Sequence, residues 1–189
     1  MRSATEEKRL LEKAKRGDRR AVGRLYDDLF PGVYGFARIR LPTAQDAEDV
    51  VSETFLAVVD RLPEFKWNHA GGFKAWVFQI ARSKIANFYR TNGHIVLGED
   101  SHPRGDKPSS SDVEDIVHRS EMRAALMGAI HRLQPRQEEV VLLRYFGGLR
   151  NREIAEVLAI NEKTVSAHVS RALKFLQDEV DRIELLEAP

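Results

Sequence analysis

The chain has 189 residues, of which 42% are hydrophobic and 31% charged, and its formal net charge is +1. That length fits one large or two small domains, and the composition is typical of a soluble protein with packed cores. The chain contains no cysteine, which excludes disulfides, thiolate metal sites and thiol redox sensing. Because no signal peptide and no long uncharged apolar run are present, the sequence predicts a cytoplasmic protein without a membrane span.

The charge is unevenly distributed despite the small total. Residues 1–91 carry about +5, residues 92–121 about −4, and the remainder about zero. A basic N-terminal half followed by an acidic stretch is compatible with a nucleic-acid partner. The weak overall charge predicts a protein that does not hold DNA tightly on its own.

Helical periodicity runs through the first half of the chain, and no alternating pattern indicates a strand. A short first helix is predicted before Asp18, which caps the next helix. Pro31 is predicted to begin a renewed helix that continues to Leu41, because proline suits a first turn better than a helix interior. Thr43 or Ala44 begins the helix after that.

A loop at 64–72 leads into a strongly amphipathic helix. Its predicted apolar face consists of Phe73, Trp76, Val77, Ile80, Ala81, Lys84 and Phe88. Phe78 lies off this stripe, and so does Tyr89. Trp76 is expected to pack in the core. Trp67 in the loop fits two roles equally well, stacking on an extruded base or packing on Phe65.

The composition changes after residue 91 to a stretch rich in glycine, proline and serine, which cannot sustain a helix or bury much surface. We therefore expect an all-α protein with two small helical domains, residues 1–91 and 113–189. A flexible linker at 92–112 is predicted to join them.

The second domain is predicted to contain four helices. The first covers 113–133, and Pro135 opens the second, which runs to Gly147–Gly148. The last two form a helix-turn-helix, in which Asn161 caps the second helix and Ala155 is small enough for a close crossing. The positions expected to bury apolar side chains between these two helices are Ile154, Leu158, Ile160, Val165 and Val169.

The outward positions of the last helix combine cationic, hydroxylic and small side chains. They are Lys163, Ser166, Ala167, Ser170, Arg171 and Lys174. Such groups contact phosphates and base edges when a helix lies in a major groove, so the pattern favours DNA binding. A plain helical hairpin within a bundle is the alternative.

Several segments share their order and spacing with one known family. In the first half these are Asp46–Phe55, Phe73–Arg82 and Phe88–Arg90. In the second they are Leu133–Glu138, Leu149 with Glu153–Ala155, and Thr164–Val165 with Arg171–Ala172. Together they resemble the bacterial RNA polymerase sigma family, in its short two-domain extracytoplasmic-function class. Ala159 departs from the pattern, because that turn position is usually glycine. A left-handed conformation there would cost roughly 1 kcal/mol.

The resemblance implies a role for each domain. Residues 1–91 would be region 2, which binds core polymerase and recognises and melts the minus-ten element, and residues 113–189 would be region 4, which reads the minus-thirty-five element. The polymerase-binding residues would be Asp46, Glu48, Asp49, Ser52 and Glu53. The minus-ten residues would be Trp67, Asn68, Lys74, Arg82 and Arg90. The minus-thirty-five residues would be Lys163, Thr164, Ser166, Ala167, His168, Ser170, Arg171 and Lys174.

The expected partners are core RNA polymerase, through its largest-subunit clamp and its flap, promoter DNA, and an anti-sigma factor. We expect no cofactor, no metal, no small-molecule substrate and no catalytic residue. One alternative is a response regulator with a similar helix-turn-helix, which would need an α/β receiver domain. Another is a metal-dependent nuclease that uses Asp46, Glu48 and Asp49.

Overall fold

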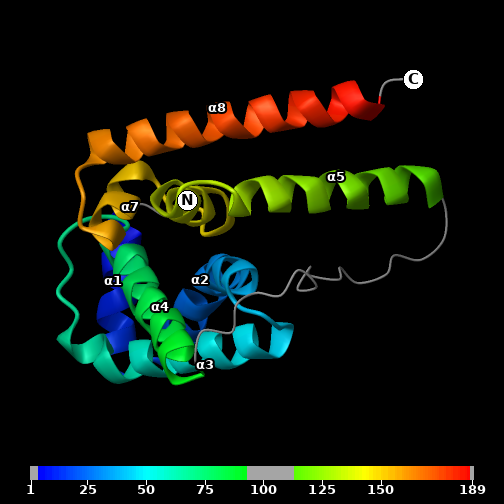
Figure 1. Cartoon of the computed structure of the whole chain (residues 1–189). Coiled ribbons are helices and arrows are strands. Elements are labelled where there is room, and N and C mark those ends of the chain that lie inside the picture. Colours follow the sequence, from blue (N-terminus) through cyan, green and yellow to red (C-terminus); the bar gives the residue numbers. More distant parts are fainter. Residues whose placement is uncertain (1–3, 93–112, 188–189) are drawn as a thin grey trace.

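The computed structural model describes residues 4–92 and 113–187, and every regular element in these two ranges is helical (Figure 1). The elements are α1 (Ala4–Lys15), α2 (Arg19–Arg40), α3 (Ala44–Arg61), η1 (Leu62–Glu64), α4 (Gly72–Thr91), α5 (Val113–His131), α6 (Pro135–Val141), η2 (Leu142–Phe146), α7 (Asn151–Leu158) and α8 (Glu162–Glu187). The predicted all-α class is confirmed. Nearly all of the predicted linker lies outside the described residues. Within the described ranges, no helix is long and apolar enough to span a membrane.

Short polar side chains begin the helices of the first half. The Asp18 carboxylate accepts hydrogen bonds of 2.9 and 3.2 Å from two N–H groups in the first turn of α2, which confirms the predicted cap. Helix α3 begins with a capping box, in which Thr43 and Asp46 each accept a hydrogen bond from the other's backbone N–H. The start of α3 at Thr43 or Ala44 is therefore confirmed.

Helix α2 runs without a break through Pro31, so the predicted new helix at this residue is wrong. Leu25 and Leu29 before the proline and Val33 after it are buried in the same core. A break in the helix at Pro31 would move either the leucines before it or the valine after it out of the core. Apolar burial on both sides therefore outweighs the cost of a proline inside the helix.

Helix α4 is buried on two sides. Phe73, Val77 and Ile80 of the predicted stripe are buried, but Phe78, which was expected off the stripe, is fully buried as well. Its ring packs edge-on against Phe36 of α2, with 5.7 Å between ring centroids. Phe78 lies off the predicted stripe, as expected, and it is buried because a second side of α4 also packs against other helices, among them α2 with Phe36.

The second half matches the predicted order of helices with one difference. Pro135 stands in the first turn of α6, but this helix ends at Val141 and continues as the π-helical turn η2 up to Gly147. Helix α5 lies beside the long helix α8, as Figure 1 shows above the N-terminal helices. The expected single helix after Pro135 is thus interrupted by a wider turn.

The helix-turn-helix consists of α7, a tight turn and the first part of α8. Ile154 and Val165 are fully buried between the two helices. Ala159 ends α7 in the left-handed conformation, with φ 52° and ψ 44°. The Asn161 side-chain oxygen accepts a 2.7 Å hydrogen bond from the backbone N–H of Thr164, which confirms the predicted cap.

The two halves pack directly on one another. Helix α7 lies against α4, η2 lies against α2, and the buried apolar residues of both halves belong to one continuous cluster. In Figure 1, α7 lies between α8 and the upper end of α4. The domain limits at residues 91 and 113 stay a prediction.

Candidate nucleic-acid interface

An acidic surface runs along α3, on the side away from its buried residues. Glu48, Asp49, Ser52 and Glu53 are exposed, whereas Asp46 is half-buried and taken up by the capping box. The carboxylate of Glu53 lies 3.1 Å from the ammonium of Lys84 on α4. In the described part of the chain, no three His, Asp or Glu side chains come together in a way that would hold a metal ion. Four of the five predicted polymerase-binding residues therefore face solvent on one exposed helix surface.

The predicted reading face of α8 is open to solvent. Its exposed members are Lys163, Ser166, Ser170, Arg171 and Lys174. The Ser166 hydroxyl donates to the carbonyl oxygen of Glu162 at 3.1 Å and accepts from the side-chain N–H of Asn151 at 2.9 Å. Thr164 is half-buried, and both its N–H and its hydroxyl donate to Asn161. Thr164 is therefore engaged by the Asn161 cap in the first turn of α8.

Two further members of the predicted reading set, Ala167 and His168, are half-buried. Burial lowers the pKa of the His168 ring, and the nearby cations Arg171 and Arg136 lower it further. The ring is therefore neutral at pH 7. Its Nδ1 atom is buried without a hydrogen-bond partner among the described residues. His168 is thus a neutral, partly packed side chain rather than a phosphate-binding cation.

The loop before α4 holds the predicted base-contacting residues. Trp67 is half-buried against the core, the ammonium of Lys8 lies 5.2 Å from its ring centroid, and its indole nitrogen is buried without an acceptor among residues 4–92 and 113–187. In this arrangement the Trp67 ring packs against the core, although it does not stack on Phe65. Asn68 is exposed, and its side-chain oxygen accepts a 2.9 Å hydrogen bond from the N–H of His69.

The three predicted cations of α4 have different surroundings. Arg90 is exposed and donates to the side-chain oxygen of Asn87, one turn away, at 2.5 Å. Lys74 and Arg82 are half-buried and bonded to the second half of the chain. Burial lowers the pKa of the Lys74 ammonium, and the nearby Glu153 carboxylate opposes this effect. The structure therefore brings Lys74 and Arg82 to the contact between the two halves rather than to an open surface.

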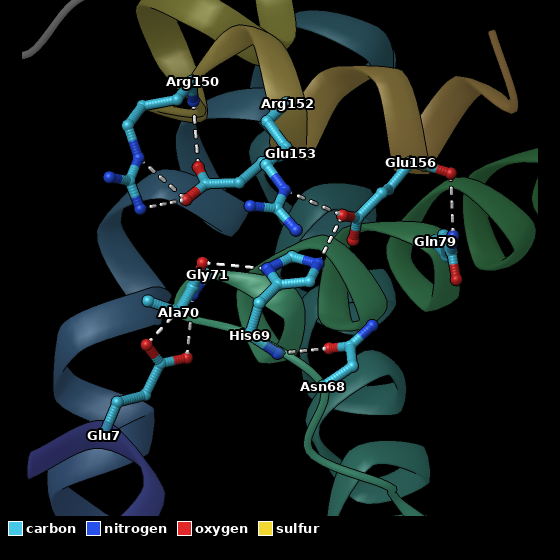
Figure 2. A network of polar contacts seen from close by, with 10 residues as sticks. All are labelled: Glu7, Asn68, His69, Ala70, Gly71, Gln79, Arg150, Arg152, Glu153 and Glu156. Atoms are coloured by element: carbon cyan, nitrogen blue, oxygen red, sulfur yellow. Dashed lines mark hydrogen bonds and ion pairs between the residues drawn. The ribbon is translucent and has the colours of Figure 1, made fainter. Parts of the chain in front are cut away.

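Sequence reasoning did not identify the polar network around this loop, which Figure 2 shows. The Nε2 atom of His69 lies 2.5 Å from the Glu156 carboxylate, and the Gln79 side chain donates to the Glu156 carbonyl oxygen at 2.9 Å. Glu153 is buried and accepts hydrogen bonds from the backbone and side chain of Arg150. The spacing of Arg150 and Glu153 at the start of a helix was the one local signal for this network.

The chain matches known protein families in both halves. The model for Sigma-70 region 2 matches residues 25–95, and the model for Sigma-70 region 4 matches residues 123–176. The ECF RNA polymerase sigma factor BldN of Streptomyces coelicolor is 35% identical over 172 residues, which make up 88% of this chain and 63% of that protein.

Two solved structures are similar in fold. CnrH, in complex with the cytosolic domain of CnrY, aligns with a TM-score of 0.66 and 24% identity, over 92% of this chain and 96% of that chain. The sigma factor RpoE of Bartonella quintana, in complex with the anti-sigma factor NepR, aligns with a TM-score of 0.62 and 22% identity, over 84% and 96% of the two chains.

A helical N-terminal half joined to a C-terminal helix-turn-helix with an open polar face is typical of a DNA-binding transcription protein. The two family matches identify the kind of transcription protein. The chain belongs to the sigma-70 family of RNA polymerase sigma factors, in its extracytoplasmic-function class. Its function is that of a sigma factor, which directs transcription initiation.

Proposed function

We propose that this sigma factor binds core RNA polymerase mainly through its N-terminal domain and selects promoters through both domains. The observation that carries the proposal is the asymmetry of the helix-turn-helix. One side of α8 is buried against α7, while cationic and hydroxylic side chains cover the other side and face solvent. Such a surface binds phosphates and base edges in a major groove.

Residues 1–91 act as region 2 in this proposal, and residues 113–189 act as region 4. The exposed acidic face of α3 docks on a basic surface of the polymerase clamp, with Asp49 and Glu53 near its centre. The loop with Trp67 and Asn68 takes part in recognition and melting of the minus-ten element. Region 4 reads the minus-thirty-five element and contacts the flap.

The protein acts by binding rather than by catalysis, and it uses no cofactor or metal. Its activity is controlled by an anti-sigma factor. Support for this last point comes from the similar fold of the Bartonella quintana sigma factor, which was solved with its anti-sigma factor NepR. Since this chain contains no cysteine, a redox signal would have to act through such a partner.

Run-off transcription with purified core polymerase and a genomic fragment library tests the proposal. Transcripts from discrete promoters should appear only when the chain is added. The double variant Asp49→Lys with Glu53→Lys should bind core polymerase roughly tenfold more weakly, because it reverses two charges on an exposed docking face.

The matched control carries Glu12→Lys and Glu64→Lys, two exposed carboxylates outside the acidic face. It should bind core polymerase as the wild type does, and circular dichroism should show equal helicity in all three proteins. Equal polymerase affinity in both double variants would rule out the acidic face as the docking surface.

A further inference from the structure

The N-terminal helix α1 contacts the loop that carries Trp67 and Asn68. The Lys15 ammonium donates a hydrogen bond to the carbonyl oxygen of Phe65, which lies at the start of the loop, 50 residues further along the chain. The Lys8 ammonium lies 5.2 Å from the centroid of the Trp67 ring. A cation at this distance is attracted to the face of an aromatic ring. Helix α1 therefore holds the start of the loop and restrains the ring of Trp67.

The end of the same loop is held by Glu7, which is also on α1. The backbone N–H of Gly71 donates hydrogen bonds of 3.0 and 3.2 Å to the two oxygens of the Glu7 carboxylate, as Figure 2 shows. Gly71 is the N-cap residue of α4, and as a glycine it has no side chain that could cap the helix. The N–H groups at the start of a helix have no intrahelical acceptor, and the helix dipole favours a carboxylate there. Glu7 thus provides from α1 an acceptor for the start of α4.

The capping box of α3 shows which acceptor α4 lacks. In α3 the third helical residue, Asp46, accepts a hydrogen bond from the backbone N–H of the N-cap residue Thr43. The third residue of α4 is Lys74, and an ammonium group cannot accept a hydrogen bond. Glu7 takes the place of this acceptor from a position 64 residues away in the sequence. The start of α4, and with it the end of the loop, therefore depends on α1.

Buried apolar side chains fix the position from which α1 reaches the loop. Leu11 and Ala14 are buried in the core, and the helix packs against α2 and η1. Leu11 lies one helical turn away from each of the three polar residues that contact the loop, so these residues border the buried stripe. The core thus sets the place of α1, and α1 in turn sets the place of the loop.

Asn68 lies between the points that α1 holds and is itself exposed. Its side-chain oxygen accepts a 2.9 Å hydrogen bond from the N–H of His69, which orients the amide within the loop. A group that captures an unstacked base binds it more tightly when the group is ordered beforehand, because less conformational entropy is lost on binding. The contacts of α1 on both sides of Asn68 supply this order.

We infer that α1 positions the loop for capture of a base from the melted minus-ten element, and that Glu7 is the main positioning residue. Glu7 acts through the backbone of Gly71 and does not itself touch DNA. Lys8 and Lys15 support it at the middle and the start of the loop. This inference rests on the proposed function of the loop.

Three full-length variants in complex with core polymerase test the inference. Glu7→Ala removes the acceptor of the Gly71 N–H, whereas Glu7→Gln keeps a side-chain oxygen at the same reach. The matched control Glu12→Ala removes an exposed carboxylate from the same helix. The template is a duplex promoter recovered from the run-off transcription library, used both intact and with its minus-ten element pre-opened.

Glu7→Ala should lower the rate of transcription from the duplex template about tenfold, as expected for the loss of a hydrogen bond to a charged group. The pre-opened template should restore the part of this loss that is due to melting. Glu7→Gln should lose no more than about threefold, because a neutral oxygen still accepts a weaker bond. Glu12→Ala should transcribe as the wild type does. Adding Glu7→Ala to Asn68→Ala should cause no further loss, since Glu7 acts only through the loop.

Hydrogen exchange of the free chain, followed by mass spectrometry, measures the positioning without polymerase or DNA. The amides of residues 65–72 should exchange faster in Glu7→Ala than in the wild type, because a loop that is held less firmly opens more often. Glu12→Ala should leave the exchange of this loop unchanged.

Equal transcription by Glu7→Ala and Glu12→Ala, with Asn68→Ala impaired, would overturn the inference and leave the proposed function of the loop intact. Losses that multiply in the double variant would overturn it as well, and so would unchanged exchange of the loop in Glu7→Ala. Normal duplex transcription by Asn68→Ala would instead refute the proposed role of the loop, and the inference with it.

Circular dichroism shows whether Glu7→Ala keeps its helicity. If it does not, Lys8→Gln decides the question, because Lys8 is exposed and its replacement removes only the cation beside the Trp67 ring. Lys8→Gln should lower duplex transcription about threefold in the wild type and cause no further loss in Trp67→Ala. A wild-type rate in Lys8→Gln would then overturn the inference.

Discussion

Replacing Ala159 with glycine should stabilise this sigma factor, although the same change weakens most helices. Ala159 ends α7 with φ 52° and ψ 44°, and its exposed methyl group buries little surface. A Cβ in the left-handed conformation costs roughly 1–2 kcal/mol. Glycine in turn lowers the free energy of the unfolded chain by about 0.4–1 kcal/mol through its greater freedom. The free energy of unfolding should therefore rise by roughly 0.5–1 kcal/mol.

Thermal unfolding followed by far-UV circular dichroism measures this change. In a chain of this size about 1 kcal/mol shifts Tm by about 2–4 °C, so Ala159→Gly should raise Tm by about 1–4 °C. The control Ala86→Gly removes another exposed methyl group, from the interior of α4, and should lower stability by about 0.5–1 kcal/mol. The affinity of Ala159→Gly for a minus-thirty-five duplex should match the wild type, because the turn keeps its geometry. A fall in Tm as large as that of Ala86→Gly would refute the reasoning from backbone strain.

Three further outcomes are expected. Arg171→Ala should lower the salt dependence of duplex binding by about one unit and leave sequence preference unchanged, as fluorescence anisotropy at several salt concentrations would show. Asn68→Ala and Trp67→Ala should impair transcription from duplex promoters, and a pre-opened template should restore the part due to melting; normal activity on duplex templates would make the loop structural. Because burial lowers the pKa of His168, the unfolded chain binds more protons below about pH 6.5, so stability should fall as the pH drops through that value. Urea unfolding should show a shallower fall in His168→Gln.

The sequence was sufficient for the features that depend on neighbouring residues. Helical periodicity indicated an all-α chain, and the caps at Asp18, Thr43 and Asn161 act within a few residues of their own positions. The left-handed turn at Ala159 could likewise be anticipated from the spacing of the helix-turn-helix. These predictions succeeded because local hydrogen bonds and backbone geometry decide them.

The candidate surfaces could be predicted as sets of residues, but not as free or occupied surfaces. Glu48, Asp49 and Glu53 follow from the helical period of α3, and they are exposed as expected. The binding roles of these residues stay predictions. No local pattern indicated that Lys74 and Arg82 on α4 would be bonded to region 4.

Only the tertiary structure decided the features that depend on residues far apart in the chain. Pro31 stays inside a continuous helix because residues on both sides of it are buried in one core. Phe78 is buried because its side of α4 packs on α2, where its ring meets Phe36. Lys74 meets an acceptor 74 residues away, and Arg82 meets one 57 residues away. Such contacts depend on how whole helices pack, which the period of a single helix does not specify, because side chains on either face of α4 obey the same period.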